Sequence, residues 1–237
     1  GVLFFYWGCD VVSKVAILID GGFYRKRAKY LWGEKNATDR ARELEAYCQA
    51  HLRKKDAGID RVLYRVFYYD CEPIGRKSVY HPLTKKNVDL DKSDTYKWMT
   101  VFLEELKKRR KFALRLGELS EVMHYNLRPS VTKDLLAGKI KLEDLTENDF
   151  EFFSQQKGVD MRIGVDIASM SFKKQVDQII LIAGDSDFVP AAKMARREGI
   201  DFILDPMWAT VRPNLFEHID GLSSMWGKKK DAPQASN

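Results

Sequence analysis

Two carboxylates follow an apolar run near the C-terminal end of the chain. In the segment "QIILIAGDSDFVP", Asp185 and Asp187 come directly after six uncharged residues and are separated by Ser186. Asp20 ends another apolar run, "KVAILID", and is followed by two glycines. Because ligands bind outside the carboxyl ends of the strands in an open parallel sheet, we expect these acids to share one edge of a sheet.

Three more acids stand next to predicted elements. Asp70 and Asp205 end apolar runs, which places them at the same edge, although each is also explained as a residue that simply ends a strand. Asp160 opens a predicted helix that leads into the "IILIAG" strand. Only the loop before that helix would bring Asp160 close to the other acids.

Each acid also has a purely structural interpretation. Asp185 and Asp187 precede a helix whose first turn contains a proline, so one of them can cap that helix and suit its dipole. On local evidence alone this capping role is favoured over metal binding. Asp160 can be a cap as well, and Asp166 lies four residues from Arg162, the spacing of a solvated ion pair.

Capping does not explain why several acids would gather in one place. Carboxylates that crowd one cleft repel each other, and their pKa values rise unless a cation neutralises them. Mg²⁺ is a natural cation for such a site because it takes oxygen ligands, keeps several waters and shares phosphate oxygens. Carboxylates with Mg²⁺ indicate phosphodiester chemistry. The four histidines are scattered and are interpreted as surface or packing residues: His51, His81, His124 and His218.

Apolar runs alternate with helical patterns along the chain. Strands are predicted at 14–20, 61–70, 111–119, 179–184 and 200–205, and helices at 39–56, 94–110, 160–172 and 186–198. The predicted inner face of the second helix carries Trp98, Val101, Phe102 and Leu106, and the third has a stripe of Met161, Val165, Ala168 and Phe172. This alternation predicts a parallel sheet covered by helices on both faces.

The stretch from 120 to 158 has a weaker pattern. "MHYNLRP" is interpreted as a strand that partners 111–119, residues 132–137 as a short helix, and "LEDLTENDFEFF" as a loop or helical turn. We therefore predict one domain over 14–225 with an elaboration within 71–158. Residues 1–13 are interpreted as an extension or an expression remnant, and 226–237 as a basic disordered tail.

Composition narrows the class of protein. The chain has 237 residues, of which 45% are apolar and 31% charged, an ordinary composition for a soluble globular protein. A net charge of +6 favours an anionic partner such as nucleic acid. Cys9, Cys48 and Cys71 form no C-x-x-C pair, which fits a reducing, cytoplasmic setting without a zinc site. The apolar "GVLFFYWGC" is too short for a membrane span.

Three motifs together carry a resemblance to a known family. "LIDGG" (18–22), "QKGVDM" (156–161) and "LIAGDSDFVP" (181–190), in this order and spacing, resemble the signature of the NYN domains, a branch of the PIN-like nucleases that includes the LabA-like proteins. The resemblance covers roughly residues 14–220. It implies a three-layer, Rossmann-like α/β/α fold with an acidic pocket that binds Mg²⁺ or Mn²⁺ and cleaves RNA. By position it assigns catalysis and metal binding to Asp20, Asp160, Asp185 and Asp187.

One position departs from the family pattern. Many NYN domains have Asn three residues after the first acid, and this chain has Phe23. The G-G-F-Y form resembles the LabA-like branch. A catalytically weak regulator that binds RNA or protein on the same fold is therefore an alternative to a metal-dependent ribonuclease.

Substrate contacts are predicted from residues near the acids. Arg25, Lys157 and Ser186 are the candidates for phosphate contacts, and Arg25 belongs to a basic run that is equally explained as a solvated helix face. Phe23, Tyr24 and Tyr80 are candidates for stacking on bases of single-stranded RNA. RNA is thus the expected partner, with no membrane and a possible homo-oligomer.

Two other enzyme classes fit less well. An aspartyl-nucleophile phosphatase would have a second acid two residues after Asp20, where this chain has Gly22. A dinucleotide-binding enzyme would have G-x-G-x-x-G after the first strand, and that motif is missing there.

Overall fold

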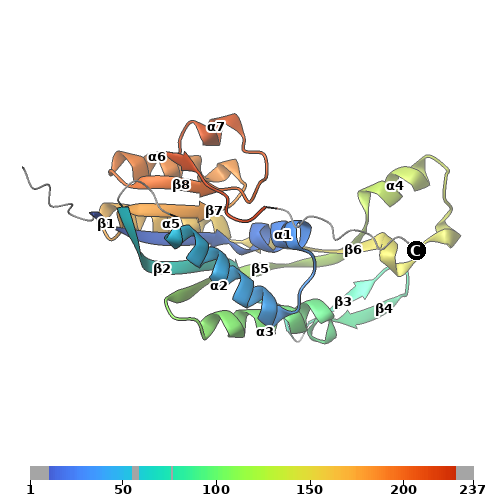
Figure 1. Ribbon diagram of the computed structural model, residues 1–237. Coiled ribbons are helices and arrows are strands. Elements are labelled where there is room, and N and C mark those ends of the chain that lie inside the picture. The colour runs from blue at the N-terminus through green and yellow to red at the C-terminus, as the bar shows by residue number, and fades with distance from the viewer. Residues whose placement is uncertain (1–10, 55–58, 76, 228–237) are drawn as a thin grey trace, which may run out of the picture. The chain divides into compact units, whose positions relative to one another are not determined.

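The protein folds into two compact units. The computed structural model describes residues 11–54, 59–75 and 77–227 (Figure 1). The first unit contains the described residues within 1–70, 102–116 and 159–237, and the second contains those within 71–101 and 117–158. The second unit falls inside the stretch for which an elaboration is predicted. Most of the predicted N-terminal extension and residues 228–237 of the predicted tail lie outside the described residues. Trp226 falls within the predicted disordered tail, but it is described and packs against Trp32 and Tyr47, so this part of the prediction is wrong.

The first unit is built on parallel strands. β1 (Val11–Asp20) pairs in parallel with β2 (Ile59–Cys71) and β7 (Gln178–Ile182), and β7 pairs with β8 (Asp201–Asp205). The short β9 (Gly221–Leu222) adds to β8, also in parallel. With β5 (Phe112–Leu127) and β6 (Phe150–Lys157) the strand order of the described sheet is β6-β5-β2-β1-β7-β8-β9. The predicted α/β class with a mostly parallel sheet is confirmed.

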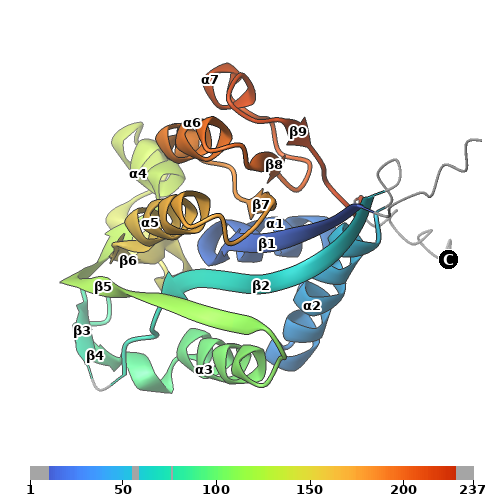
Figure 2. The same cartoon turned by 90° about the vertical axis from the view of Figure 1, so that its left-hand side faces the viewer.

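Helices cover both faces of the parallel strands. α1 (Gly21–Trp32) and α2 (Ala37–Arg53) lie on one face, and α5 (Val159–Phe172) and α6 (Val189–Arg197) lie on the other (Figure 2). α1 and α2 contact each other through the rings of Trp32 and Tyr47, whose centroids are 5.2 Å apart. α1 ends at Gly33, whose positive φ of 79° favours a residue without a Cβ atom.

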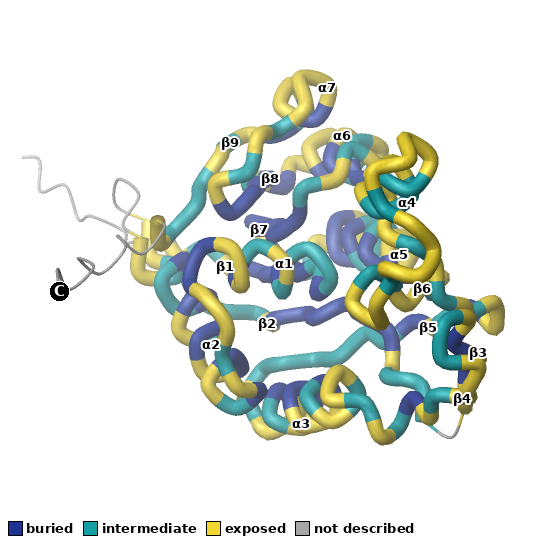
Figure 3. Tube along the Cα trace, turned by 90° about the vertical axis from the view of Figure 1, so that its right-hand side faces the viewer, coloured by how far each residue is buried: buried dark blue, intermediate teal, exposed yellow. Residues whose placement is uncertain are grey.

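The core lies along the central strands (Figure 3). Every residue from Val15 to Ile19 in β1 is fully buried, and all of β7 is buried. A continuous apolar run forms such a strand because helices cover both of its faces. Each fully buried aliphatic side chain contributes about 1.5–3 kcal/mol relative to an exposed one.

The second unit is largely antiparallel. β3 (Ser78–His81) and β4 (Lys86–Asp89) form a hairpin, and the later part of β5 pairs antiparallel with β6. His81 is buried, and its ring lies 4.6 Å from Tyr125 and 5.0 Å from Phe150, measured between centroids. α4 (Pro129–Leu136) lies between β5 and β6 in sequence. α3 (Asp94–Lys107) and β5 contribute residues to both units.

Short elements complete the chain. These are the 3₁₀ helices Leu90–Lys92, Leu142–Asp144, Glu147–Asp149 and Ser186–Phe188, and the single-turn helix α7 (Pro213–Phe216). No helix among the described residues combines the length and the apolar content that a membrane crossing needs.

The prediction for 120–158 was partly wrong. The segment "MHYNLRP" continues the same strand, β5, and does not form a partner to it. Its partner is β6, which begins at Phe150, within the segment predicted to be a loop or turn. β6 contains Gln, Ser and Glu beside its aromatic residues, so it lacks the apolar run that marks a buried strand.

Two helix faces also need correction. Val101 of α3 is 46% exposed, while Phe102 and Leu106 are buried as predicted. In α5 the stripe that includes Met161, Val165 and Phe172 is exposed, and the buried residues are Val159, Ile163, Ile167, Met170 and Ser171. α5 is apolar on more than one face, so periodicity alone did not select the buried one.

Candidate functional site

Asp20 is the last residue of β1 and caps α1. Its Oδ1 accepts a hydrogen bond from the backbone N–H of Phe23 at 3.0 Å, and the residue is half-buried. Gly21 follows because the chain passes close to β2 at this point. A Cβ atom at Gly21 would lie 2.5 Å from both Asp70 Oδ2 and the Tyr68 hydroxyl. Only glycine therefore lets α1 begin directly against the end of β2.

Asp70 ends the first unit's part of β2 and is buried. The Tyr68 hydroxyl donates a hydrogen bond to its Oδ2 at 2.8 Å, and the Arg25 guanidinium forms an ion pair with the same oxygen. Burial and the charge of Asp70 raise the pKa of Tyr68, which keeps this hydroxyl a donor. Arg25 is thus engaged by a buried carboxylate, and its contact with phosphate stays a prediction.

The G-D-S-D turn presents two exposed carboxylates after β7. Asp185 caps the 3₁₀ helix Ser186–Phe188, and its Oδ1 accepts a hydrogen bond from the backbone N–H of Asp187 at 3.2 Å. Phe188 is buried and anchors the turn in the core. Ser186 Oγ accepts a hydrogen bond from Arg212 Nη1 at 3.2 Å. The predicted capping role of Asp185 is confirmed. Both acids of the turn are exposed to solvent.

Asp160 couples the two strand ends electrostatically. Burial, followed by the negative charges of Asp185 and Asp187, raises the pKa of Asp160. Burial, followed by the charges of Asp160 and Asp70, raises the pKa of Asp20, against an opposing hydrogen bond from the backbone. The four acids Asp20, Asp160, Asp185 and Asp187, here called the acid group, therefore lie within one electrostatic field although they come from three distant segments.

Asp205 ends β8 in a different environment. It is completely buried, and four groups donate to its two carboxylate oxygens or pair with them. The Tyr47 hydroxyl and His51 Nε2 lie 2.6 and 2.7 Å from Oδ2, and the Met207 N–H and the Ser224 hydroxyl lie 2.7 and 2.8 Å from Oδ1. Asp205 therefore joins α2, β8 and the C-terminal segment, and it is separate in role from the acid group.

Two further predictions concern residues near the acid group. The predicted ion pair between Asp166 and Arg162 is wrong, because Asp166 accepts from the Tyr69 hydroxyl at 2.7 Å and from Arg115 Nε at 3.0 Å. This contact ties α5 to β2 and β5. Lys157 is the last residue of β6, in the second unit, so its proximity to the acids stays a prediction.

Comparison with known families adds independent information. Residues 104–211 match the NYN domain. The match supports the NYN family and covers slightly less than half of the chain, including Asp160, Asp185 and Asp187 but not Asp20. An NYN domain implies a PIN-like nuclease, which supports a ribonuclease in coarse terms. The LabA-like branch stays a prediction.

Other comparisons add little. The crystal structure of a protein of unknown function from Vibrio parahaemolyticus is similar over 89% of this chain and 91% of that chain, with 12% sequence identity and a TM-score of 0.43. No curated protein matches the chain.

The acid group suits a hard divalent cation by its chemistry but not as a closed cage. Within the described residues, no three side chains of His, Cys, Asp or Glu are gathered closely enough to hold a metal ion. Four carboxylates nevertheless supply the oxygen donors that Mg²⁺ and Mn²⁺ prefer. Mg²⁺ commonly binds through one or two carboxylates and keeps its remaining waters. The donor set of the NYN motifs therefore fits a largely hydrated ion.

Phe23, which stands where many NYN domains have Asn, packs against the G-D-S-D turn. A Cβ atom at Gly184 would lie 2.4 Å from Cε2 of the Phe23 ring, so the ring closely covers this glycine. Of the three predicted stacking residues, Tyr24 is completely buried, which makes that prediction wrong. Phe23 is half-buried, and Tyr80 in the second unit is 55% exposed.

Sequence reasoning missed the partners of the strand-end acids. Tyr68 and Asp70 are two residues apart on one strand, so their side chains share a face, and this spacing was a usable signal for their hydrogen bond. The engagement of Asp205 by His51 and Tyr47 had no comparable signal. Those residues lie more than 150 positions apart in sequence from Asp205, and only the packing of α2 brings them there.

Proposed function

We propose that this protein is a divalent-metal-dependent ribonuclease that hydrolyses phosphodiester bonds of single-stranded RNA at the acid group. One observation carries the proposal: the charges of Asp185 and Asp187 act on Asp160, and the charge of Asp160 acts on Asp20. Capping accounts for Asp20 and Asp185 one at a time, but it gives no reason for like charges to converge. A bound cation gives that reason.

The residues of the acid group have separable roles. The backbone N–H of Phe23 fixes one oxygen of Asp20, and the backbone N–H of Asp187 fixes one oxygen of Asp185, so both carboxylates are oriented before any ligand binds. Asp160 and Asp187 add negative charge from α5 and the turn. When bound, Mg²⁺ or Mn²⁺ would supply an activated water and neutralise charge on the scissile phosphate.

Two cationic side chains near the acid group have different roles. Arg212 is exposed and donates to Ser186 inside the G-D-S-D turn, so its guanidinium lies beside the acid group. Arg25 holds Asp70 against the start of α1 and so acts mainly on the position of Asp20. A net charge of +6 for the chain favours the approach of an RNA strand.

A catalytically weak RNA-binding or protein-binding regulator is the second candidate. Two observations favour it. The ring of Phe23 covers Gly184 where many NYN domains have a polar Asn side chain, and the described residues contain no ready three-ligand cage. Replacing Phe23 by Asn discriminates between the candidates, because a missing orienting hydrogen bond would be restored and cleavage would rise. An unchanged or lower rate removes this explanation for weak activity.

A pair of variants on one helix tests the ribonuclease. We expect the parent protein to cleave labelled single-stranded RNA with Mn²⁺ and to be inactive in EDTA. Asp160→Asn should reduce cleavage by about 10²-fold or more, the effect of losing one preorganised charged group. Asp166→Asn, also on α5 but bonded to Tyr69 and Arg115, is the matched control and should cleave at nearly the parent rate while folded.

The same pair can contradict the proposal. Equal cleavage by the parent, Asp160→Asn and Asp166→Asn would show that the activity does not depend on the acid group. Cleavage that persists in EDTA would remove the metal from the mechanism.

A further inference from the structure

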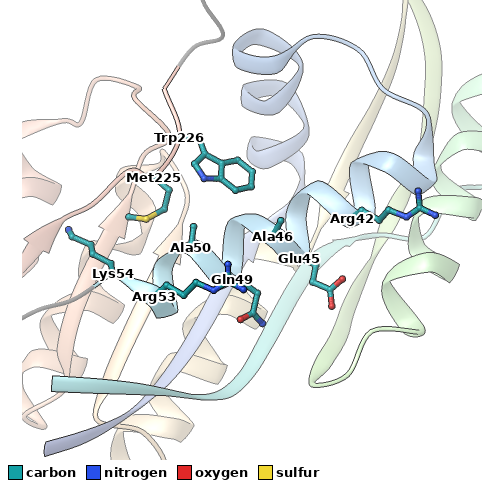
Figure 4. A pocket seen from close by; sticks show the side chains of 9 residues that line it. All are labelled: Arg42, Glu45, Ala46, Gln49, Ala50, Arg53, Lys54, Met225 and Trp226. Atoms are coloured by element: carbon teal, nitrogen blue, oxygen red, sulfur yellow. The ribbon is translucent and has the colours of Figure 1, made fainter. Parts of the chain in front are cut away.

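A groove runs beside α2, away from the residues of the acid group. It has a volume of about 650 Å³ and is lined by α2 on one side and by Met225 and Trp226 on the other. Figure 4 shows Trp226 and Met225 facing Ala46 and Ala50 of the helix. Small alanine side chains at these positions leave the groove open.

The charge of the groove is positive. Arg42, Arg53 and Lys54 line it, together with a single carboxylate, Glu45. Arg42 forms an exposed ion pair with Asp39 at 3.1 Å, so the main cations of the groove are Arg53 and Lys54. Arg109 already forms an ion pair with Glu45, which neutralises that carboxylate. Lys54 donates to the hydroxyl of Ser223 at 2.9 Å, which leaves its charge unneutralised by that contact. Within the described part of the chain Arg53 has no ion-pair partner, so the groove presents cations to an anionic ligand.

An aromatic wall stands beside these cations. The ring of Trp226 is 39% exposed and packs edge-on against Trp32 and Tyr47, with centroids 5.7 and 5.2 Å away. The backbone carbonyl of Trp226 accepts a hydrogen bond from Nε1 of Trp208 at 2.9 Å. Trp208 thus lies beside the C-terminal segment that forms one side of the groove, although its own side chain is not part of the groove lining.

Trp208 is held in a costly conformation with its ring in solvent. Both Met207 and Trp208 have positive φ, 45° and 61°, which is strained for residues with a Cβ atom. Hydrogen bonds fix the pair: Asp205 accepts from Met207 N–H, Arg27 donates twice to the Met207 carbonyl, and Ser224 accepts from Trp208 N–H. The ring that these contacts position is 58% exposed. Strain maintained in this way is typical of binding sites.

α1 extends from the acid group to the groove, so its length gives the approximate separation of the two sites. It starts next to Asp20 and ends at Trp32, which contacts Trp226. A helix of 12 residues is about 18 Å long, so a strand that fills both sites must extend over several nucleotides.

From these features we infer that the groove beside α2 binds single-stranded RNA. The choice of RNA as the ligand rests on the ribonuclease proposed above. Trp226 in the groove and Trp208 beside it offer stacking surfaces for bases, and Arg53 and Lys54 offer contacts for phosphates. An anionic backbone with stackable bases matches both sets of groups, whereas an acidic peptide matches only the cations. The groove therefore holds the strand at a distance from the acid group and makes long substrates bind better than short ones.

Binding is measured without cleavage, by fluorescence anisotropy of labelled single-stranded RNA in EDTA. Trp208→Gly removes the exposed ring and also relieves the positive φ, so the fold is not strained further. It should weaken binding of an oligonucleotide of about 15 residues about tenfold. Phe172→Ala removes an equally exposed aromatic from α5, on the other face of the sheet, and should have no effect.

A second matched pair tests the cations. Arg53→Gln should weaken binding of the long oligonucleotide by about 3–10-fold and lower the salt dependence by about one unit of slope. Lys193→Gln, which removes an exposed cation from α6 on the other face, should change binding less than twofold. Equal losses in the two variants would mean diffuse attraction and would overturn the inference.

The remaining outcomes separate this inference from the proposed function. Competition by a glutamate-rich peptide as effective as RNA would assign the groove to an acidic protein partner instead. Weaker RNA binding by the groove variants, in a protein that fails to cleave RNA with Mn²⁺, would keep the inference and remove the ribonuclease. Unchanged binding by the groove variants, in a protein whose cleavage depends on Asp160, would do the reverse.

Discussion

Asp205 and Asp185 both follow parallel strands of one sheet, yet their surroundings differ in nearly every respect. Asp205 is completely buried, and two hydroxyls, a backbone N–H and an imidazole lie within hydrogen-bond distance of its two oxygens. Asp185 is exposed, and the described contact of its side chain is one backbone N–H. Its charge instead acts on Asp160.

The difference teaches how to read an acid at the end of a strand. A buried carboxylate surrounded by donors is part of the structure, because removing it leaves those donors unpaired. A carboxylate near other acids contributes little to the stability of the fold, and its charge raises the pKa values of those acids. A bound cation would offset this repulsion. The same change, Asp to Asn, should therefore have opposite consequences at the two positions.

Asp185→Asn should have the largest effect on activity. We expect cleavage of single-stranded RNA to fall by about 10²–10³-fold, since a hard anionic ligand is lost. The thermal midpoint in EDTA should stay unchanged or rise slightly, because Asn caps about as well as Asp and the repulsion with Asp160 is relieved. The upward shift of the midpoint on adding Mn²⁺ should shrink. A variant with the full Mn²⁺ shift and full cleavage would show that Asp185 is only a cap.

Asp205→Asn should have the largest effect on stability. An amide replaces the carboxylate between Tyr47 and His51, and at least one buried donor loses its acceptor, which costs about 3 kcal/mol. For a chain of this size the midpoint should fall by roughly 6–12 °C. The folded fraction should still cleave RNA at the parent rate. A variant with a parent-like midpoint would remove the distinction between the two acids.

Tyr47→Phe tests a single contact of the Asp205 network. Burial and the charge of Asp205 raise the pKa of Tyr47, so its hydroxyl stays protonated and donates at 2.6 Å. Deleting the hydroxyl should lower stability by about 1–2 kcal/mol, which thermal unfolding would register as a drop of a few degrees. A loss as large as that of Asp205→Asn would mean that Tyr47 carries the whole network.

The smallest expected effect is a pH dependence of the acid group. Because the folded-state pKa values of Asp20 and Asp160 are raised, their contribution to stability is fully present below the unfolded value of 3.8 and is lost as the pH rises through the folded values. In EDTA, Asp160→Asn should therefore gain about 1–2 °C over the parent between pH 4 and pH 7. Thermal scans across this range, with Asp166→Asn as control, measure this gain, and its absence would show that the pKa of Asp160 is not raised in the folded protein.

Local sequence patterns predicted most of the parallel core. β7 and the inner parts of β1 and β8 are continuous apolar runs, the pattern of a strand buried on both faces. In β2 the apolar run is confined to the buried half of the strand that follows Arg65. β6 escaped prediction because its polar residues alternate with aromatics in a sheet extension that is mostly solvated. The buried face of α5 was also predicted wrongly. Because α5 carries apolar residues on two faces, its periodicity fits either face and does not show which one is buried.

What the sequence alone determined was the type and position of the chemical groups: acids directly after apolar runs, glycine after Asp20, and the three NYN-like motifs. These are local features, and a strand or a cap depends mostly on neighbours within a few residues. Only the tertiary structure decided which acids act on one another. It places Asp160 within the electrostatic influence of Asp185 and Asp20, whereas Asp205 is in hydrogen-bond contact with Tyr47 and His51. The reason is physical: charge coupling and desolvation depend on distance and burial in space, which the packing of helices on the sheet sets and no local pattern encodes.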